Sequence, residues 1–185
     1  MLYLIGGASR SGKTTTAKKI LKEAGIPYFS LDYLMMGIAH GVPELEVQPT
    51  EGDFLTGQRL WKIVDPLMTA MVENGIDYTV EGVQLLPAFV AEFQQKFAGD
   101  VKCCFIGQAE LDVTAVEEMK FHSSATENDG FNDLNHQEAL AEMKRIRADS
   151  ARYKEESEMH NLPYFESSSD FHRTLDQVVA YLINK

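Results

Sequence analysis

The chain has 185 residues, a formal net charge of −11 and a pI near 4.9. Apolar residues make up 44% and charged residues 24%, a composition typical of a soluble globular domain that excludes a largely disordered chain. This length fits a single domain over residues 1–185. Nucleic-acid backbones and anionic membranes both attract positive charge, so the acidic balance predicts that neither is a partner.

The two cysteines, Cys103 and Cys104, are neighbours in an apolar segment that reads as a buried strand. Successive residues of a strand point to opposite faces, so a disulfide between them is not expected. No apolar run approaches the length of a membrane span, and Met1 is followed at once by a strand-like segment. We therefore expect a cytoplasmic protein.

Short apolar segments alternate along the chain with longer segments of helical periodicity. Residues 11–24, 60–71, 136–161 and 171–182 show the helical pattern, with Asp170 as the expected N-cap of the last helix. Pro66 falls inside the second of these helices and predicts a kink or a break. Strands are expected at residues 2–6, 27–31, 76–80, 101–106 and 162–165.

This alternation predicts an α/β fold, with a doubly wound, mainly parallel, five-stranded sheet and helices on both faces. Two segments rich in turn residues, 41–52 and 123–135, are expected to be long loops. The second belongs to a region, at about residues 121–152, that we interpret as a short lid.

The strongest motif follows the first strand, where GASRSGKT matches the phosphate-binding loop (P-loop) pattern G-x-x-x-x-G-K-[ST] at every fixed position. A strand precedes it and a helix follows, which argues against a chance glycine-rich turn. The residues expected to bind the nucleotide are Gly7, Ala8, Ser9, Arg10, Ser11, Gly12, Lys13, Thr14 and Thr15. The motif predicts binding of ATP with Mg²⁺: Lys13 contacts the β- and γ-phosphates and Thr14 is a ligand of the metal. Arg10 has two open interpretations, a phosphate contact or a solvent-exposed side chain.

Two classes of P-loop protein are disfavoured. The Asn-Lys-x-Asp motif of GTPases does not occur, and no Asp-x-x-Gly follows an apolar strand. The chain is also shorter than the large ATPase machines. Phosphoryl transfer to a small acceptor, the reaction of a kinase, is the class that remains.

Two acids lie where predicted strands end. Asp32 follows the second strand and Glu81 follows the third, and the carboxyl ends of parallel strands face the ligand crevice. Asp32 is expected to bind the acceptor and to take or orient its hydroxyl proton, with helix capping as the alternative. Glu81 is expected on the acceptor side and near Mg²⁺, holding it through water, with a surface glutamate as the alternative.

The chain has only six arginines, and their placement is therefore informative. Arg145 and Arg152 share one flank of the apolar stripe of the long helix, and Arg147 falls on the other. An arginine from this helix is expected to close over the phosphates, although pairing with neighbouring acids is an equal alternative. Arg59, two residues before Trp61, is a candidate cation of the acceptor site. These assignments make Lys13, Asp32, Arg145 and Arg152 catalytic, and Asp32, Arg59 and Glu81 acceptor-binding.

The P-loop, Asp32 and the segment VEGVQLLP at residues 80–87 together resemble small P-loop kinases, most closely the 2-phosphoglycerate kinase family. The matching positions of the family's Glu-Gly-Val-x-Leu-x-Pro segment are Glu81, Gly82, Val83, Leu85 and Pro87. Ile146-Arg147, a helix and the strand NLPY continue the likeness. The resemblance implies transfer of the γ-phosphoryl group of ATP to a small hydroxylated or phosphorylated metabolite.

The sequence departs from that family at two points, since Gln84 stands where the family has histidine and residues 123–135 contain no arginine. Nucleoside kinases, nucleoside monophosphate kinases of the adenylate kinase type and antibiotic phosphotransferases share the expected fold. A non-catalytic nucleotide sensor and a toxin-like kinase of large precursors are further alternatives. The acceptor, the preference for ATP over GTP and the choice between monomer and homodimer stay open.

Overall fold

The computed structural model describes residues 1–124 and 130–184, with side chains described everywhere except at residues 121–124. Within these residues five parallel strands form one sheet in the order β2-β3-β1-β4-β5. In chain order the elements are β1 (Leu2–Gly7), α1 (Lys13–Ala24), β2 (Tyr28–Ser30), α2 (Leu31–Gly41), η1 (Pro43–Leu45), α3 (Asp53–Glu73), β3 (Tyr78–Glu81), α4 (Pro87–Lys96), β4 (Val101–Gly107), α5 (Val116–Ser124), η2 (Gly130–Asp133), α6 (His136–Met159), β5 (Tyr164–Glu166) and α7 (Phe171–Ile183). The predicted doubly wound α/β architecture is confirmed, and each predicted strand overlaps an observed one.

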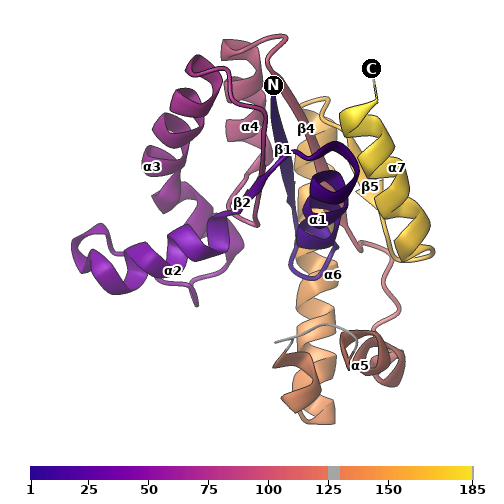
Figure 1. The fold of residues 1–185 in the computed structure, drawn as a ribbon. Coiled ribbons are helices and arrows are strands. Elements are labelled where there is room, and N and C mark those ends of the chain that lie inside the picture. The colour runs from indigo at the N-terminus through magenta and orange to yellow at the C-terminus, as the bar shows by residue number, and fades with distance from the viewer. Residues whose placement is uncertain (125–129, 185) are drawn as a thin grey trace.

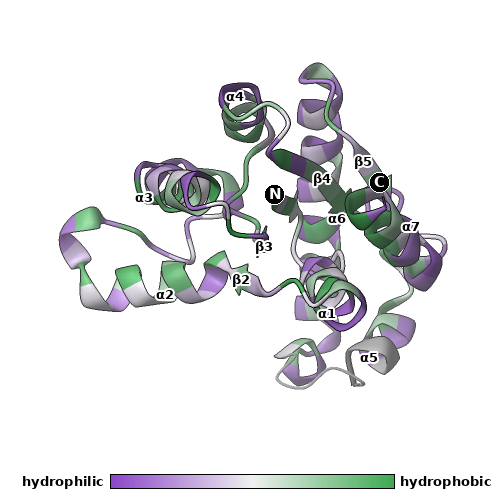
Figure 2. Ribbon diagram, turned by 45° about the horizontal axis from the view of Figure 1, so that its top comes forward, coloured by the Kyte–Doolittle hydropathy of each residue, from purple (hydrophilic) through white to green (hydrophobic). Residues whose placement is uncertain are grey.

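Helices cover both faces of the sheet (Figure 1). Leu4 of β1 points into a core formed with α3, α4 and α6, whereas Ile5 points into a second core beneath α1 and α7. The neighbouring strand β4 repeats this alternation: Cys103 belongs to the first core and Cys104 to the second. Both thiols are free and buried, and burial raises the pKa of Cys103 to about 12. The hydropathy colouring shows β4 as an apolar strand between these layers (Figure 2).

The helix expected at residues 60–71 is longer than its apolar pattern, and the predicted break at Pro66 does not occur. α3 runs without interruption from Asp53 to Glu73, with Pro66 inside it. Proline removes one backbone N–H and crowds the carbonyl four residues earlier, which here belongs to Lys62. Both Lys62 and Pro66 are exposed, so water can satisfy that carbonyl, while Leu60, Val64 and Met68 stay buried on the opposite face.

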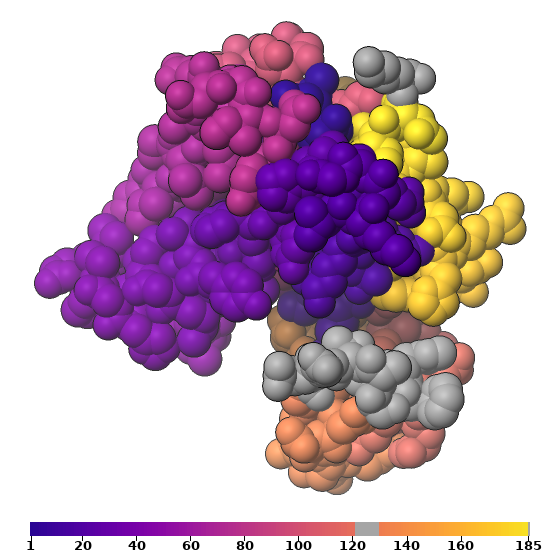
Figure 3. Space-filling model, viewed as in Figure 1, coloured from indigo at the N-terminus to yellow at the C-terminus, as the bar shows by residue number. Residues whose placement is uncertain are grey.

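Two projections flank the carboxyl end of the sheet. α2, η1 and the start of α3 extend to one side, and α5, η2 and the first half of α6 extend below (Figure 1). The lower projection has its own apolar cluster of Val116, Phe131, Ala139 and Met143. In the space-filling view a notch separates α2 from this projection, beneath α1 (Figure 3).

The predicted loops are only partly confirmed. Residues 41–52 contain the short helix η1, and residues 123–135 contain the end of α5 and the helix η2, while residues 125–129 lie outside the described part of the chain. Among the described residues no helix has the length and apolar character needed to cross a bilayer.

Candidate functional site

The turn between β1 and α1, residues 8–12, is a backbone loop with a glycine at each side, called the cradle below. Gly7 has φ of 122°, and a Cβ there would lie 1.9 Å from the Ile106 carbonyl oxygen, so only glycine fits. Gly12 has φ of 99° and stands as the N-cap of α1 without a side-chain cap. The free N–H groups and positive end of α1 therefore face this turn, an arrangement suited to an anion.

Lys13 is the first residue of α1, and its side chain folds back over the turn. Its Nζ donates to the Ala8 carbonyl oxygen at 2.6 Å, and the residue is only 6% exposed. Burial lowers the pKa of the ammonium, while Glu81 and Asp32 act in the opposite direction. A buried ammonium beside the cradle is thus available to a phosphate group that replaces the Ala8 carbonyl as its partner.

Thr14 and Glu81 meet where a metal ion would be needed. Thr14 Oγ1 donates to Glu81 Oε1 at 3.0 Å, and Glu81 is 1% exposed. Glu81 Oε2 has no hydrogen-bond partner among the described residues. Burial raises the pKa of this carboxyl, with Lys13 opposing.

These two side chains fit Mg²⁺, which is commonly held by one or two protein oxygens together with substrate phosphates. No group of three or more His, Cys, Asp or Glu suited to a metal occurs among residues 1–124 and 130–184. The site for the ion would therefore depend on Thr14, Glu81 and the nucleotide. The assignment of these residues to Mg²⁺ stays a prediction.

Asp32 lies in the first turn of α2 rather than at the end of β2, because the helix already begins at Leu31. It is exposed and does not cap the helix, whose N-cap residue is Ser30. Gln84 Nε2 donates to Asp32 Oδ1 at 2.9 Å. The chain thus fixes one carboxylate oxygen and leaves the other side of the carboxyl accessible.

Gln84 was not identified from the sequence as a site residue, although its departure from the family pattern had drawn attention to it. The residue is completely buried between β3 and α4. Tyr153 of α6 holds this segment, since its hydroxyl donates to the Val83 carbonyl oxygen. The ring of Tyr153 packs against Phe54 and Phe105, with centroids 4.8 and 6.1 Å apart.

Asp53 is a second residue that sequence reasoning missed. It opens α3, its side chain is 12% exposed, and its Oδ2 has no partner among the described residues. Burial raises the pKa of Asp53, and the ammonium of Lys13 opposes that shift. The carboxylates of Asp32, Asp53 and Glu81 all oppose the lowering of the Lys13 pKa, so three acids interact electrostatically with one cation.

The two arginines predicted to close over the phosphates are engaged by acids. Arg145 makes a two-pronged contact with Glu142 at 2.9 and 2.7 Å, contacts Asp149 at 3.2 Å, and lies 4.0 Å from Asp53. Arg152 is 2.9 Å from Glu156 and lies over the Phe54 ring at 3.4 Å. The alternative of neighbouring ion pairs is therefore what the structure shows, and a role toward phosphate stays a prediction.

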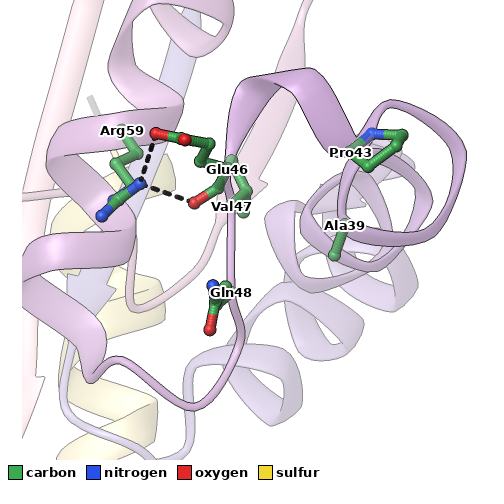
Figure 4. Close-up of a pocket in the computed structure, with 6 residues that line it drawn as sticks. All are labelled: Ala39, Pro43, Glu46, Val47, Gln48 and Arg59. Atoms are coloured by element: carbon green, nitrogen blue, oxygen red, sulfur yellow. Dashed lines mark hydrogen bonds and ion pairs between the residues drawn. The ribbon is translucent and has the colours of Figure 1, made fainter.

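Arg59 and Arg10 also contact protein groups. Arg59 Nη1 donates to the Glu46 carbonyl oxygen at 2.7 Å and its Nε lies 3.0 Å from Glu51, closing one wall of a hollow of about 380 Å³ (Figure 4). Arg10 adopts φ of 60°, and its guanidinium lies 4.9 Å from the Phe131 ring centroid in η2. Arg10 thus links the P-loop to the lower projection.

Comparison with known proteins identifies the fold. No protein-family model matches the sequence, and no curated protein matches it. Among solved structures, a shikimate kinase from Bacteroides thetaiotaomicron aligns with a TM-score of 0.58 and 13% identity, covering 98% of both chains. A sugar kinase from Janibacter sp. gives 0.55 and 15%, covering 98% of this chain and 93% of that one. A gluconokinase from Sinorhizobium meliloti gives 0.54 and 17%, covering 97% and 90%. The chain therefore has the fold of the P-loop kinases.

Proposed function

We propose that the protein is a kinase that transfers the γ-phosphoryl group of ATP to a hydroxyl group of a small metabolite. The observation that carries this proposal is the meeting of Lys13, the Thr14–Glu81 pair and Asp32 at one end of the sheet. A nucleotide sensor needs the phosphate-binding turn. It does not need Asp32, an exposed acid that Gln84 holds in position near that turn. The structural likeness to kinases supports the same conclusion.

The reaction follows from the side chains. The P-loop N–H groups and Lys13 hold the phosphates, and Asp32 orients the acceptor hydroxyl. The hydroxyl oxygen forms a bond to the γ-phosphorus while the bond to the β–γ bridging oxygen breaks, and ADP leaves with that electron pair. The hydroxyl proton passes to Asp32 and then to solvent. Thr14, and Glu81 through water, would hold Mg²⁺, which when bound would supply positive charge to the phosphate oxygens.

The resemblance to 2-phosphoglycerate kinases makes 2-phosphoglycerate a first acceptor to assay, and the structural neighbours add shikimate and gluconate. The proposed small-molecule acceptor and its class are tested by release of ADP over a panel of hydroxylated metabolites, with product identified by mass. Asp32→Asn serves as the catalytic variant, and Asp100→Asn, at an exposed turn before β4, is its matched control. Phosphorylated product that requires Asp32 supports the kinase, whereas tight ATP binding without transfer or hydrolysis contradicts it.

A further inference from the structure

The acceptor side of the candidate site carries an excess of negative charge. Asp32, Asp53 and Glu81 are three carboxylates that interact electrostatically with the single ammonium of Lys13. Glu81 accepts from Thr14 at 3.0 Å, and Asp32 accepts from Gln84 at 2.9 Å. The phosphates of the nucleotide would occupy Lys13 and leave the carboxylates of Asp32 and Asp53 facing an acceptor.

The nearby arginines do not compensate for these acids. Arg145 lies 4.0 Å from Asp53 but is also shared with Glu142 and Asp149, both within 3.2 Å, so three carboxylates face its one positive charge. Arg59 is likewise shared between Glu46 and Glu51.

A neutral polar group lies at the same place. Gln84 is completely buried, donates to Asp32, and keeps an Oε1 atom without a partner among the described residues. Its amide packs so closely on Gly82 that a Cβ there would lie 2.4 Å from Oε1. A buried carbonyl oxygen and neighbouring carboxylates are hydrogen-bond acceptors, so they suit a ligand that brings donors, such as hydroxyl or ammonium groups.

From this arrangement we infer that the phosphoryl acceptor is a hydroxylated compound without negative charge, a polyol or amino sugar, in contrast to 2-phosphoglycerate. The inference rests on the proposed kinase function and adds the charge class of its acceptor. An anionic acceptor would meet Asp32, Asp53 and the nucleotide phosphates, while Arg59 and Arg145 are each already shared between carboxylates. Neutral and cationic acceptors meet no such repulsion, and an ammonium group would gain from it.

The test uses pairs of compounds with one carbon skeleton and different charge. Glucose, gluconate and glucosamine form one set, and glycerol, glycerate and 2-phosphoglycerate form another. ADP release is measured over a concentration series of each compound with saturating Mg²⁺·ATP. A rise in ADP release reports phosphoryl transfer, and a fall below the basal rate of ATP hydrolysis reports occupation of the acceptor site. In either case, the compound concentration that gives half of the full change is its half-effect concentration.

We expect the half-effect concentration of the uncharged or cationic member of each set to be at least about tenfold below that of its anionic partner. Asp53→Asn should reduce the ratio of the anionic to the uncharged half-effect concentration several-fold. The control Glu73→Gln, at the exposed far end of the same helix, should leave it unchanged. The inference is overturned if the anionic member acts at an equal or lower half-effect concentration, or if Asp53→Asn leaves the ratio unchanged; either result leaves the kinase proposal intact. Absence of both transfer and ATP hydrolysis contradicts the proposed function, and the inference with it.

Discussion

Replacing Lys13 by methionine removes the ammonium of the P-loop and keeps an unbranched stem of similar length. Lys13 is 6% exposed and its Nζ contacts only Ala8 at 2.6 Å in the hydrogen bonds described. A unit charge about 4 Å from a phosphate oxygen is worth about 4 kcal/mol at an effective dielectric constant near 20. We therefore expect turnover to fall by about a thousandfold.

The same substitution should leave the fold intact. Burial lowers the pKa of Lys13 despite its acidic neighbours, so the charged form is net unfavourable in the folded protein. The free energy of unfolding should therefore drop by no more than about 1 kcal/mol. It is measured by urea denaturation, alongside ADP release at saturating Mg²⁺·ATP.

Lys18→Met is the matched control, because Lys18 is exposed on the same helix. It should retain wild-type turnover and stability. Turnover of Lys13→Met within tenfold of the wild type would refute the role given to this side chain. A loss of turnover that merely accompanies unfolding would refute the electrostatic argument.

Four further substitutions test the cradle, the acids Asp32 and Glu81, and Gln84. Gly7→Ala should lower stability by about 3 kcal/mol or more, because the new Cβ collides with the Ile106 carbonyl oxygen, and a melting temperature within 2 °C of the wild type, roughly 0.5–1 kcal/mol, would contradict the cradle geometry. Asp32→Asn should keep ATP affinity and lose about 100-fold or more in transfer, and Gln84→Met should lose about tenfold, with unchanged kcat in either variant speaking against a positioned base. Glu81→Gln should gain stability relative to the wild type as pH rises above 4.5, since the raised pKa of Glu81 stabilises the fold only while the carboxyl is protonated. Urea titrations without Mg²⁺ from pH 4 to 7 measure that difference, and a flat or falling difference would exclude the burial effect.

Much of the nucleotide-binding side of the site could be predicted from the sequence, because its residues lie close together in the chain. The spacing of Gly7, Gly12, Lys13 and Thr14 encodes a backbone shape, and a strand before it and a helix after it confirm the context. The position of Glu81 at the end of a strand is local information of the same kind. Its pairing with Thr14, 67 residues away, follows from the parallel sheet.

The acceptor side depends on contacts between distant segments, and the sequence does not reveal them. Asp53 lies between the expected loop at residues 41–52 and the apolar periodicity that begins at residue 60, whereas α3 extends back to Asp53. Gln84 is a neutral side chain whose importance arises only from contact with Asp32, 52 residues away. Arg59 and Arg145 are candidates from their charge and helix position, and only the structure shows which acids share that charge.

Calorimetric titration of the wild-type protein with ATP and Mg²⁺ shows whether the turn between β1 and α1 cradles the phosphates of a nucleotide. We expect one site per chain with a dissociation constant below 1 mM, which corresponds to a binding free energy of about −4 kcal/mol or more negative. Binding without Mg²⁺ should be weaker, because the Thr14–Glu81 pair would then lack its ion. If millimolar ATP gives no saturable binding, the turn is not a nucleotide site.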